Sequence, residues 1–522
     1  RWHIIFFLSE NLEKAIYYGT LAGEKAMKYF SYQEAGDYWN KVLTLMEGKN
    51  LKESPEKPLE ILISQAQAHN FLGKSESSWN SLKKAESISS AIVNYPRLPE
   101  IKRRLGQLCY RQGKFDEALG YYEEGLKFVL NSTAPEAIAE KGKIYNALAA
   151  LYRRQGKRDK ALDSIEKALE SANFQGDRAQ IADILTLKGL VYKEKGEGQT
   201  ALECYQKSLQ ICEEIGDYTE AVANYNNLGG LWLELMGDHK KALECFDKGL
   251  QLAKKINNKT WIGALYSNAA CAYYYRGEWA KAVENLEKGF EIQKKGNAFQ
   301  QMSFTLNNLA EAYREMGDFD KAMGNYHQAL SIALEAQDAE AEVQSYLGMG
   351  VTLLLKGDRE KSLEYLVKTR DMSEASGYKP ALTLAYYYIA KWHFEEGDDE
   401  NTGVFLDKSE RLFEEVRNPE VLVKIKELRG ERAFHKREWE KALLFYGEGL
   451  KLLENLPRVF DKGRILYEIG RLYLNKYRST SDEDSRQKGL KFLDDSLNIF
   501  NQIGAETYIN KVKKEFQEIL KA

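Results

Sequence analysis

With 522 residues, 43% of them hydrophobic and 29% charged, the chain can bury a large core, yet no run of about 18 apolar residues is present that could cross a membrane. A formal net charge of −3 gives no global signal for a nucleic-acid or membrane partner. The five cysteines form no CxxC pair, which favours free thiols and a cytoplasmic location.

The first 50 residues differ from the rest of the chain and are predicted to form a helical entry segment. The chain begins with Arg1 instead of methionine, and its apolar start at residues 2–8 is too short for a membrane span and lacks a signal-peptide cleavage pattern. We therefore expect the chain to be part of a longer protein. A first helix pair is predicted at residues 58–90.

A recurring glycine organises the chain after residue 90. The period is close to 40 residues, and in the last period Arg437 takes the place of glycine. A period of this length indicates an array of supersecondary units, each packed on its neighbours. The recurring glycines are Gly113, Gly156, Gly196, Gly237, Gly277, Gly317, Gly357 and Gly397.

Small and large residues keep fixed distances from each glycine. Around Gly317, for example, Ala310 lies seven residues before it, and Ala322, Tyr326 and Ala329 lie five, nine and twelve residues after it. These spacings place one stripe of side chains on each of two helices, and the glycine suits the left-handed end of the first helix. The small residues are predicted to let the helices approach, and the large residue to fill the space between units.

This pattern resembles the tetratricopeptide repeat, in a variant with slightly longer helices. The resemblance implies an all-α, right-handed superhelical solenoid of about twelve antiparallel helix pairs, in which the first helix of each pair lines a concave groove. The expected array covers residues 58–504 and is closed by a capping helix at residues 505–522. Its units are expected near residues 58–90, 97–131, 135–173, 177–215, 217–256, 258–295, 298–337, 338–377, 378–416, 418–456 and 458–503.

Both ends of the chain carry a second resemblance. The segments at residues 12–46 and 500–505 are similar to the beginning and the end of the helical sensor region of STAND signal-transduction ATPases, the class that includes MalT-like regulators. The resemblance implies that an NTPase module of the same full-length chain precedes Arg1.

A ladder of asparagines is the first candidate binding feature. Asn227, Asn268 and Asn308 occupy the same place in three successive units, with Asn226 and Asn307 beside two of them. In the tetratricopeptide repeat this place faces the concave groove, where an amide can donate to and accept from the backbone of an extended peptide. The alternative is that these amides bond the neighbouring helix.

Two runs of three tyrosines, at residues 273–275 and 386–388, form the second candidate. Successive helical residues point about 100° apart, so the members of one run cannot all enter the core. Tyr275, Tyr387 and Tyr388 are therefore predicted to face the groove, where a tyrosine suits both peptides and sugars. Packing or simple exposure is the alternative.

No catalytic or metal-binding arrangement is found. The six histidines are scattered, and Gly73-Lys74-Ser75 lacks the first glycine and the preceding strand of a phosphate loop, so no cofactor is predicted. Basic residues between Arg103 and Lys160 gather at two adjacent turns, but a solvated edge is the simpler interpretation, and nucleic acid is not the expected partner.

The sequence therefore predicts a non-enzymatic module that binds a peptide or protein segment in its concave groove, as the sensor region of a larger signalling ATPase. Binding would change the pitch of the array, because contacts between units are local. Two alternatives stay open: a sensor of a small molecule such as a sugar in a transcription regulator, and a constitutive protein–protein scaffold.

Overall fold

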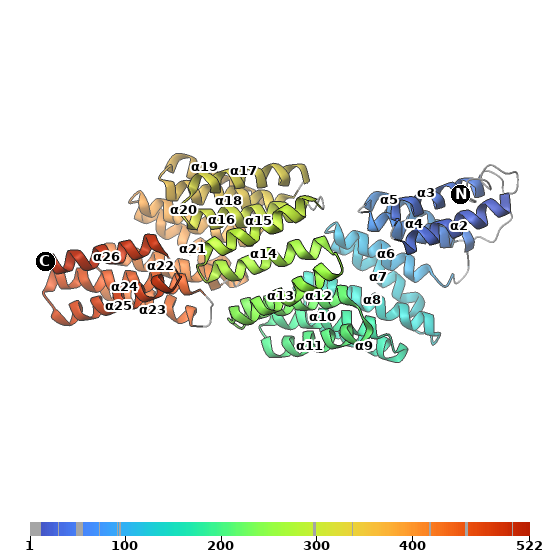
Figure 1. Cartoon of the computed structure of the whole chain (residues 1–522), viewed down its shortest axis with the longest axis horizontal. Helices are drawn as coiled ribbons and strands as arrows, with labels where there is room; N and C mark the ends of the chain where they lie inside the picture. Colours follow the sequence, from blue (N-terminus) through green and yellow to red (C-terminus); the bar gives the residue numbers. More distant parts are fainter. Residues whose placement is uncertain are drawn as a thin grey trace. The chain divides into compact units, whose positions relative to one another are not determined.

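The structure is a computed structural model that describes residues 12–29, 31–47, 56–72, 74–90, 92, 95–295, 299–336, 338–416, 419–454, 458–503 and 505–521. Within these ranges the chain is helical and contains no strand, which confirms the all-α prediction (Figure 1). The predictions that concern residues 2–8 and Gly73 fall outside the described residues.

Within the described residues the helices form twelve successive pairs and a final single helix, as predicted. The first six pairs are α2 (Leu12–Lys28) with α3 (Tyr32–Glu47), α4 (Glu56–Phe71) with α5 (Ser75–Ser89), α6 (Leu98–Arg111) with α7 (Phe115–Val129), α8 (Pro135–Arg154) with α9 (Arg158–Gln175), α10 (Arg178–Lys195) with α11 (Gly198–Ile215), and α12 (Tyr218–Glu234) with α13 (His239–Lys255). The remaining elements are α14 (Lys259–Tyr275) with α15 (Trp279–Lys295), α16 (Phe299–Glu315) with α17 (Phe319–Ala336), α18 (Ala339–Lys356) with α19 (Arg359–Ser376), α20 (Lys379–Glu395) with α21 (Asp399–Val416), α22 (Pro419–His435) with α23 (Trp439–Leu453), α24 (Val459–Thr480) with α25 (Glu483–Ile503), and α26 (Glu506–Lys521).

The recurring glycines end the first helix of each pair from α6/α7 to α20/α21 in the left-handed conformation, as predicted. All eight have φ between +68° and +90°, and Arg437 adopts φ of +59° at the equivalent place. At Gly317 the turn is closed by the amide of Asp318, which donates to the carbonyl of Tyr313 (2.9 Å). The Asp318 carboxylate then accepts from the amide of Lys321 (3.2 Å) and caps the next helix.

The predicted packing stripe is confirmed as well. The small residues five places after the glycine are all 0% exposed, and the large residues nine places after it are at most 2% exposed, as Ala322 and Tyr326 illustrate. Gly106, seven residues before Gly113, lies so close to Tyr122 that a Cβ atom would be 2.5 Å from the ring. Repeat geometry therefore follows directly from where the sequence keeps side chains small.

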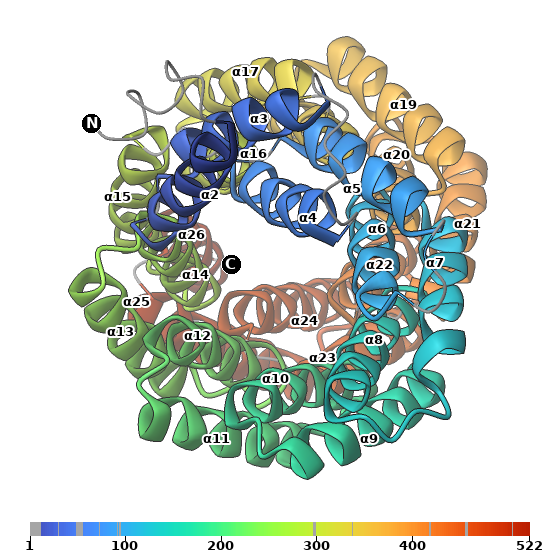
Figure 2. The same cartoon turned by 90° about the vertical axis from the view of Figure 1, so that its right-hand side faces the viewer.

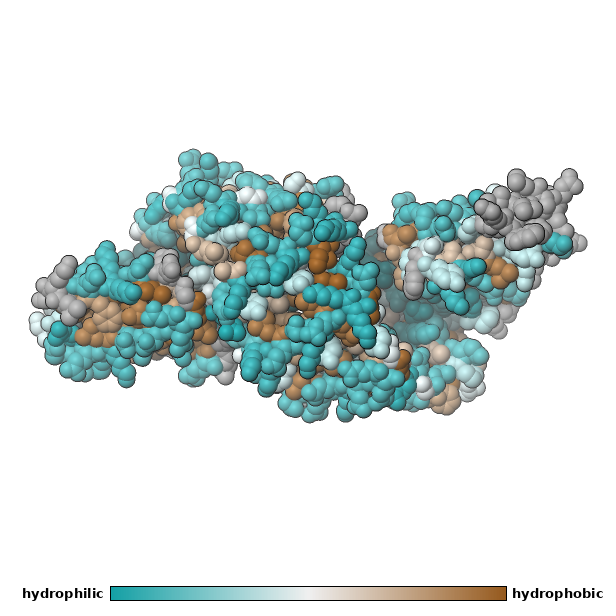
Figure 3. Space-filling model, viewed as in Figure 1, coloured by the Kyte–Doolittle hydropathy of each residue, from teal (hydrophilic) through white to brown (hydrophobic). Residues whose placement is uncertain are grey.

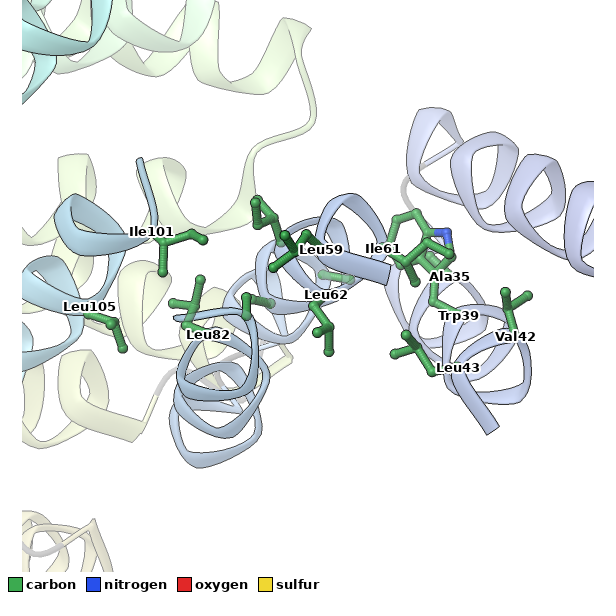
Figure 4. Packing of buried hydrophobic residues seen from close by; sticks show 14 of the residues in the cluster. Ala35, Trp39, Val42, Leu43, Leu59, Ile61, Leu62, Leu82, Ile101 and Leu105 are labelled. Carbon is green, nitrogen blue, oxygen red and sulfur yellow. The ribbon is translucent and has the colours of Figure 1, made fainter. Parts of the chain in front are cut away.

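The chain divides into two compact units, the first comprising Arg1–Ile215 and the second Gly216–Ala522. The core of the first unit begins in α2 with Ile16, includes Trp39 (2% exposed) and Leu62, and continues into α6 through Ile101 and Leu105 (Figure 4). Each pair thus shares its core with the next one.

The visible surface is mainly hydrophilic, with smaller apolar patches between the helices (Figure 3). Among the described residues, none of the helices combines the length and the hydropathy that a membrane span requires.

Candidate functional site

In the second unit the last helices, α24 to α26, contact the repeat that α14 and α15 form. The ring of Trp279, at the start of α15, lies 5.3 Å from that of Phe460 in α24, edge to face. Phe460 also contacts Tyr508 of α26 (5.2 Å between centroids), and Ile503 at the end of α25 lies against Gly277. We call this contact the closing seam.

The closing seam encloses the inner faces of the helices that lie between α14 and α26. In Figure 2 the inner helices of the second unit, α14, α16, α20, α22 and α24, surround a central space. Among the side chains of these helices, a cavity of about 330 Å³ is bordered by the seam residues Trp279, Phe460 and Tyr508. We call it the central cavity. Its other aromatic lining residues are Tyr274, Tyr275, Phe319, Tyr387 and Tyr388.

Two further cavities adjoin the central cavity. One, of about 450 Å³, shares Leu355, Lys391, Arg464, Tyr508 and Lys511 with it, and we call it the polar cavity because its other lining residues are mostly charged. The other, of about 90 Å³, shares Tyr274, Tyr275 and Arg458 with the central cavity and is also lined by Asn308. The three cavities thus lie side by side, and together they could take an extended ligand.

Beside the closing seam, ion pairs join α22 to the start of α24, and a cation–π contact reaches across to α14. Arg458 pairs with Glu420 of α22 and with Asp461 of α24, and its guanidinium lies over the ring of Tyr275, 5.5 Å from the centroid. Lys424 also pairs with Glu420, at 3.3 Å. Burial alone would raise the pKa of Glu420, but Lys424 and Arg458 outweigh it and keep the carboxylate ionised.

Two carboxyls of the polar cavity behave differently. Burial raises the pKa of Glu427 to about 6, although Arg464 opposes the shift, and burial raises the pKa of Glu468 to about 7 against the opposing charge of Arg471. Glu431 adds negative charge near both and raises them further. The interior therefore contains groups that change charge near neutral pH.

The structure brings four of the predicted site residues to these cavities. Tyr275, Tyr387 and Tyr388 line the central cavity, and Asn308 lines the small one. Tyr387 is more deeply placed than the groove-facing prediction implied, since it is only 5% exposed and its ring lies 4.9 Å from that of Tyr388. The amide nitrogen of Asn308 is buried and has no hydrogen-bond partner among the described residues.

The other four asparagines lie outside the three cavities, and three of them bond neighbouring helices. Asn268 of α14 donates to Asn226 of α12 (2.6 Å). Asn307 is 6% exposed and accepts from the hydroxyl of Ser345 in α18 (2.9 Å). Asn227 is half-buried. Whether the ladder binds a ligand stays a prediction, but part of it already connects successive repeats.

Sequence reasoning missed most of the charged lining, although the periodicity contained a signal for it. In the first helix of a repeat, the side chains that face the interior continue from the asparagine position toward the recurring glycine. They lie six and three residues before that glycine. The lining residues at these places are Cys271, Tyr274, Glu311, Arg314, Val351, Leu354 and Lys391. Among the described residues no group of histidine, cysteine and carboxylate side chains could hold a metal ion.

A model of the tetratricopeptide repeat matches residues 140–214, 180–255, 225–295 and 301–375, and a second model of this repeat matches residues 99–129. Together the matches cover just over half of the chain.

Two curated proteins illustrate the similarity. The human protein O-mannosyl-transferase TMTC1 is 30% identical over 137 residues, 22% of this chain and 15% of that protein. The photosystem I assembly protein Ycf3 of Prochlorococcus marinus is 33% identical over 93 residues, 18% of this chain and 47% of that protein. The chain spans less than half the length of each.

Two solved structures are similar to the chain, and the first of them shares its fold. A Rap protein complexed with Competence and Sporulation Factor has a TM-score of 0.50 at 16% identity, over 77% of this chain and 99% of that one. A STAND protein with a tetratricopeptide-repeat sensor from Pyrococcus horikoshii has a TM-score of 0.46 at 18% identity, over 72% of this chain and 55% of that one.

Proposed function

Because the chain belongs to the tetratricopeptide-repeat family, we propose that it is a non-enzymatic recognition module whose second unit binds an extended peptide or protein segment in its interior. The observation that carries this proposal is the row of three adjoining cavities along the inner faces of α14 to α26. Aromatic and charged side chains together line the central cavity, and mostly charged side chains line the polar cavity.

The chemistry of the lining fits a peptide. Tyrosine and tryptophan offer large contact areas at low entropic cost, as the rings of Tyr275, Trp279 and Tyr388 do here. The free amide of Asn308 supplies a donor for a backbone carbonyl, because leaving it buried and unbonded costs about 1–3 kcal/mol. A ligand that satisfies this group would recover part of that cost.

The wider role is also part of the proposal. We propose that the module is the sensor region of a larger signalling ATPase and that an NTPase module of the same full-length chain is its second partner. This rests on the resemblance of residues 12–46 and 500–505 to the ends of such sensor regions. The full-length coding sequence tests it, because the proposal requires a phosphate loop upstream of Arg1.

Affinity selection tests the binding proposal. The 522-residue chain is incubated with a random hexapeptide pool, and retained peptides are identified by mass spectrometry. We expect retention by the parent and its loss in the double variant Tyr275→Ala/Asn308→Ala. The control is Tyr17→Ala, a change to a 56% exposed tyrosine of α2 in the first unit. Retention that is equal in all three proteins would contradict binding in the cavities.

A small-molecule sensor is the second candidate, and the size of the central cavity favours it. About 330 Å³ falls at the lower end of the range of ligand pockets. Native mass spectrometry of the purified chain separates the two functions. A retained small mass that is lost in Tyr275→Ala or Tyr388→Ala supports the sensor, whereas a constitutive scaffold predicts no small ligand and no peptide selection.

A further inference from the structure

The charges that line the central cavity do not balance. Its two lining carboxylates are already paired, Glu315 with Arg314 (3.1 Å) and Asp461 with Arg458 and Arg464. Two other lining cations, Lys391 of α20 and Lys511 of α26, have no ion pair or hydrogen bond with any of the described residues. The unneutralised charge of this cavity is therefore positive.

The two lysines lie where the central cavity meets the polar cavity, since both side chains line both spaces. Lys511 stacks over the ring of Tyr508, with its ammonium 4.5 Å from the centroid. Burial is the main cause that lowers the pKa of Lys511; Glu468 opposes this shift, and Lys391 adds to it. Two ammonium groups that repel each other in a partly enclosed space are stabilised by an anion between them.

Nearby carboxylates do not remove this imbalance. Glu431 faces the polar cavity and has no ion pair among the described residues, but Lys514 lines the same cavity and is also without one. Glu427 and Glu468 are engaged by Arg464 and Arg471. Among the described residues, Lys391, Lys511 and Lys514 therefore lack an ion pair, and Glu431 is the one carboxylate of this cavity that also lacks one.

We propose that an anionic group of the ligand, a carboxylate or a phosphate, binds between Lys391 and Lys511 and thereby couples ligand binding to closure of the second unit. The proposal deepens the proposed function and rests on it for the identity of the ligand. Lys391 belongs to the wall of the interior, whereas Lys511 belongs to α26, the helix that completes the closing seam. An anion that bridges them ties α26 to the wall, and its absence leaves the two charges to repel.

The test uses the whole chain with ¹³C-dimethylated lysines, which keep their charge, and two probes, sodium acetate and inorganic phosphate, against sodium chloride at equal ionic strength. We expect the signals of Lys391 and Lys511 to shift and saturate, and the amides of α26 to exchange more slowly. Lys391→Met or Lys511→Met should weaken the response of the remaining lysine by about tenfold, the loss of one charged contact. Lys513→Met, on the exposed face of the same helix, is the matched control and should respond like the parent.

Saturation by acetate alone assigns a carboxylate, and saturation by phosphate alone assigns a phosphate group. The proposal is overturned if the signals of Lys391 and Lys511 do not shift with either probe. It is also overturned if they shift to the same extent as the signal of Lys513, as ionic screening alone would produce. Failure of the two proposals can be told apart. Peptides retained by a chain whose two lysine signals stay still refute the anion site alone. Shifted lysine signals in a chain that retains no peptide support the site and contradict peptide binding.

Discussion

The two units share one repeat, but their helices meet in different ways. In the first unit the described helices pack against their neighbours along the chain, and the space between α4, α5 and α6 is only about 20 Å³. In the second unit α15 meets α24 and α26 through Trp279, Phe460 and Tyr508, and the enclosed cavity is about 330 Å³. Repeat packing builds both units, whereas in the second unit aromatic contacts between distant repeats border the interior.

The largest expected effect tests what the units share. Gly106 in the first unit and Gly430 in the second each lie where a Cβ atom would be 2.5 Å from a tyrosine ring, that of Tyr122 or Tyr446. We expect Gly106→Ala and Gly430→Ala to lower the free energy of unfolding by about 1–3 kcal/mol each, because the buried rings have no room to move. Thermal and urea denaturation measure the change.

Matched controls exist on the second helices of the same two repeats. Gly120 of α7 and Gly447 of α23 are exposed, and a Cβ atom there would meet nothing within 4 Å. Gly120→Ala and Gly447→Ala should therefore stabilise the helix by about 0.5–1 kcal/mol. If all four variants behaved alike, close approach of the helices would not be the reason for the glycines.

The next effect concerns the closing seam and should appear in one unit only. Trp279→Ala removes an edge-to-face contact with Phe460 and part of the cluster around Tyr508, which we expect to cost about 1–2 kcal/mol. Hydrogen exchange should become faster in α24 and α26 and stay unchanged in α2 to α11. Trp79→Ala removes a contact with Tyr121 inside the first unit. It should make hydrogen exchange faster in the first unit and leave α24 and α26 unchanged.

The fold and its register could be predicted from the sequence because every repeat packs its two helices through the same small and large residues. Glycine spacing predicts the left-handed turns, and it predicts Arg437 at one of them. It predicts that Tyr326 is buried but not where its ring packs. The ring lies against Gly348 of the next repeat, and its hydroxyl accepts from Arg314 (3.1 Å), although Ala310 occupies the place opposite in the pattern. The repeat spacing predicts which residues of adjacent helices meet. A side chain that packs elsewhere, as Tyr326 does, is seen only in the structure.

The candidate site was predictable in part for the same reason. The asparagine position of one repeat is the position of Tyr388 in another, so the inner stripe could be followed from sequence to several of the lining side chains. The contact between Trp279 and Phe460 depends on the curvature accumulated over the repeats between them. No short-range pattern encodes it, and therefore the contributions of Arg458, Tyr508 and Lys511 to the cavity could not be derived.

A pH-dependent difference also separates the two units. The pKa of Glu468 is raised from its ordinary value of 4.5 to about 7 by burial, so the native state holds a proton that the unfolded chain has lost between these pH values. Stability from this group is complete below pH 4.5 and is lost as the pH rises through 7, by at most about 1.4 kcal/mol per pH unit. In the first unit the resolved carboxylate shifts, those of Glu86 and Glu100, lie in the opposite direction.

Urea denaturation between pH 4.5 and 7.5, followed by hydrogen exchange in each unit, measures this dependence. We expect the second unit to lose stability over this range and the first unit to lose none. Glu468→Gln keeps an acceptor for Arg471, which donates at 2.9 Å, and should flatten the slope. A slope that is unchanged in the variant would assign the pH dependence to another group, with Glu427 the next to replace.

The smallest effect lies at the one repeat turn that lacks its glycine. Arg437 adopts φ of +59°, and a residue with a side chain pays about 1–2 kcal/mol in this conformation, whereas glycine loses about 0.5–1 kcal/mol in unfolded-state entropy. Arg437→Gly should therefore raise the free energy of unfolding by about 0.5 kcal/mol, and the reverse change Gly397→Arg in the preceding repeat should lower it by a similar amount.

Both variants lie at turns of the second unit, so hydrogen exchange in α20 to α23 should record the changes while that of the first unit stays constant. Equal and opposite shifts would show that the turns contribute independently of the closing seam. If Arg437→Gly were destabilising instead, the arginine would have to contribute contacts that outweigh its backbone strain, and the repeat with the missing glycine would be specialised.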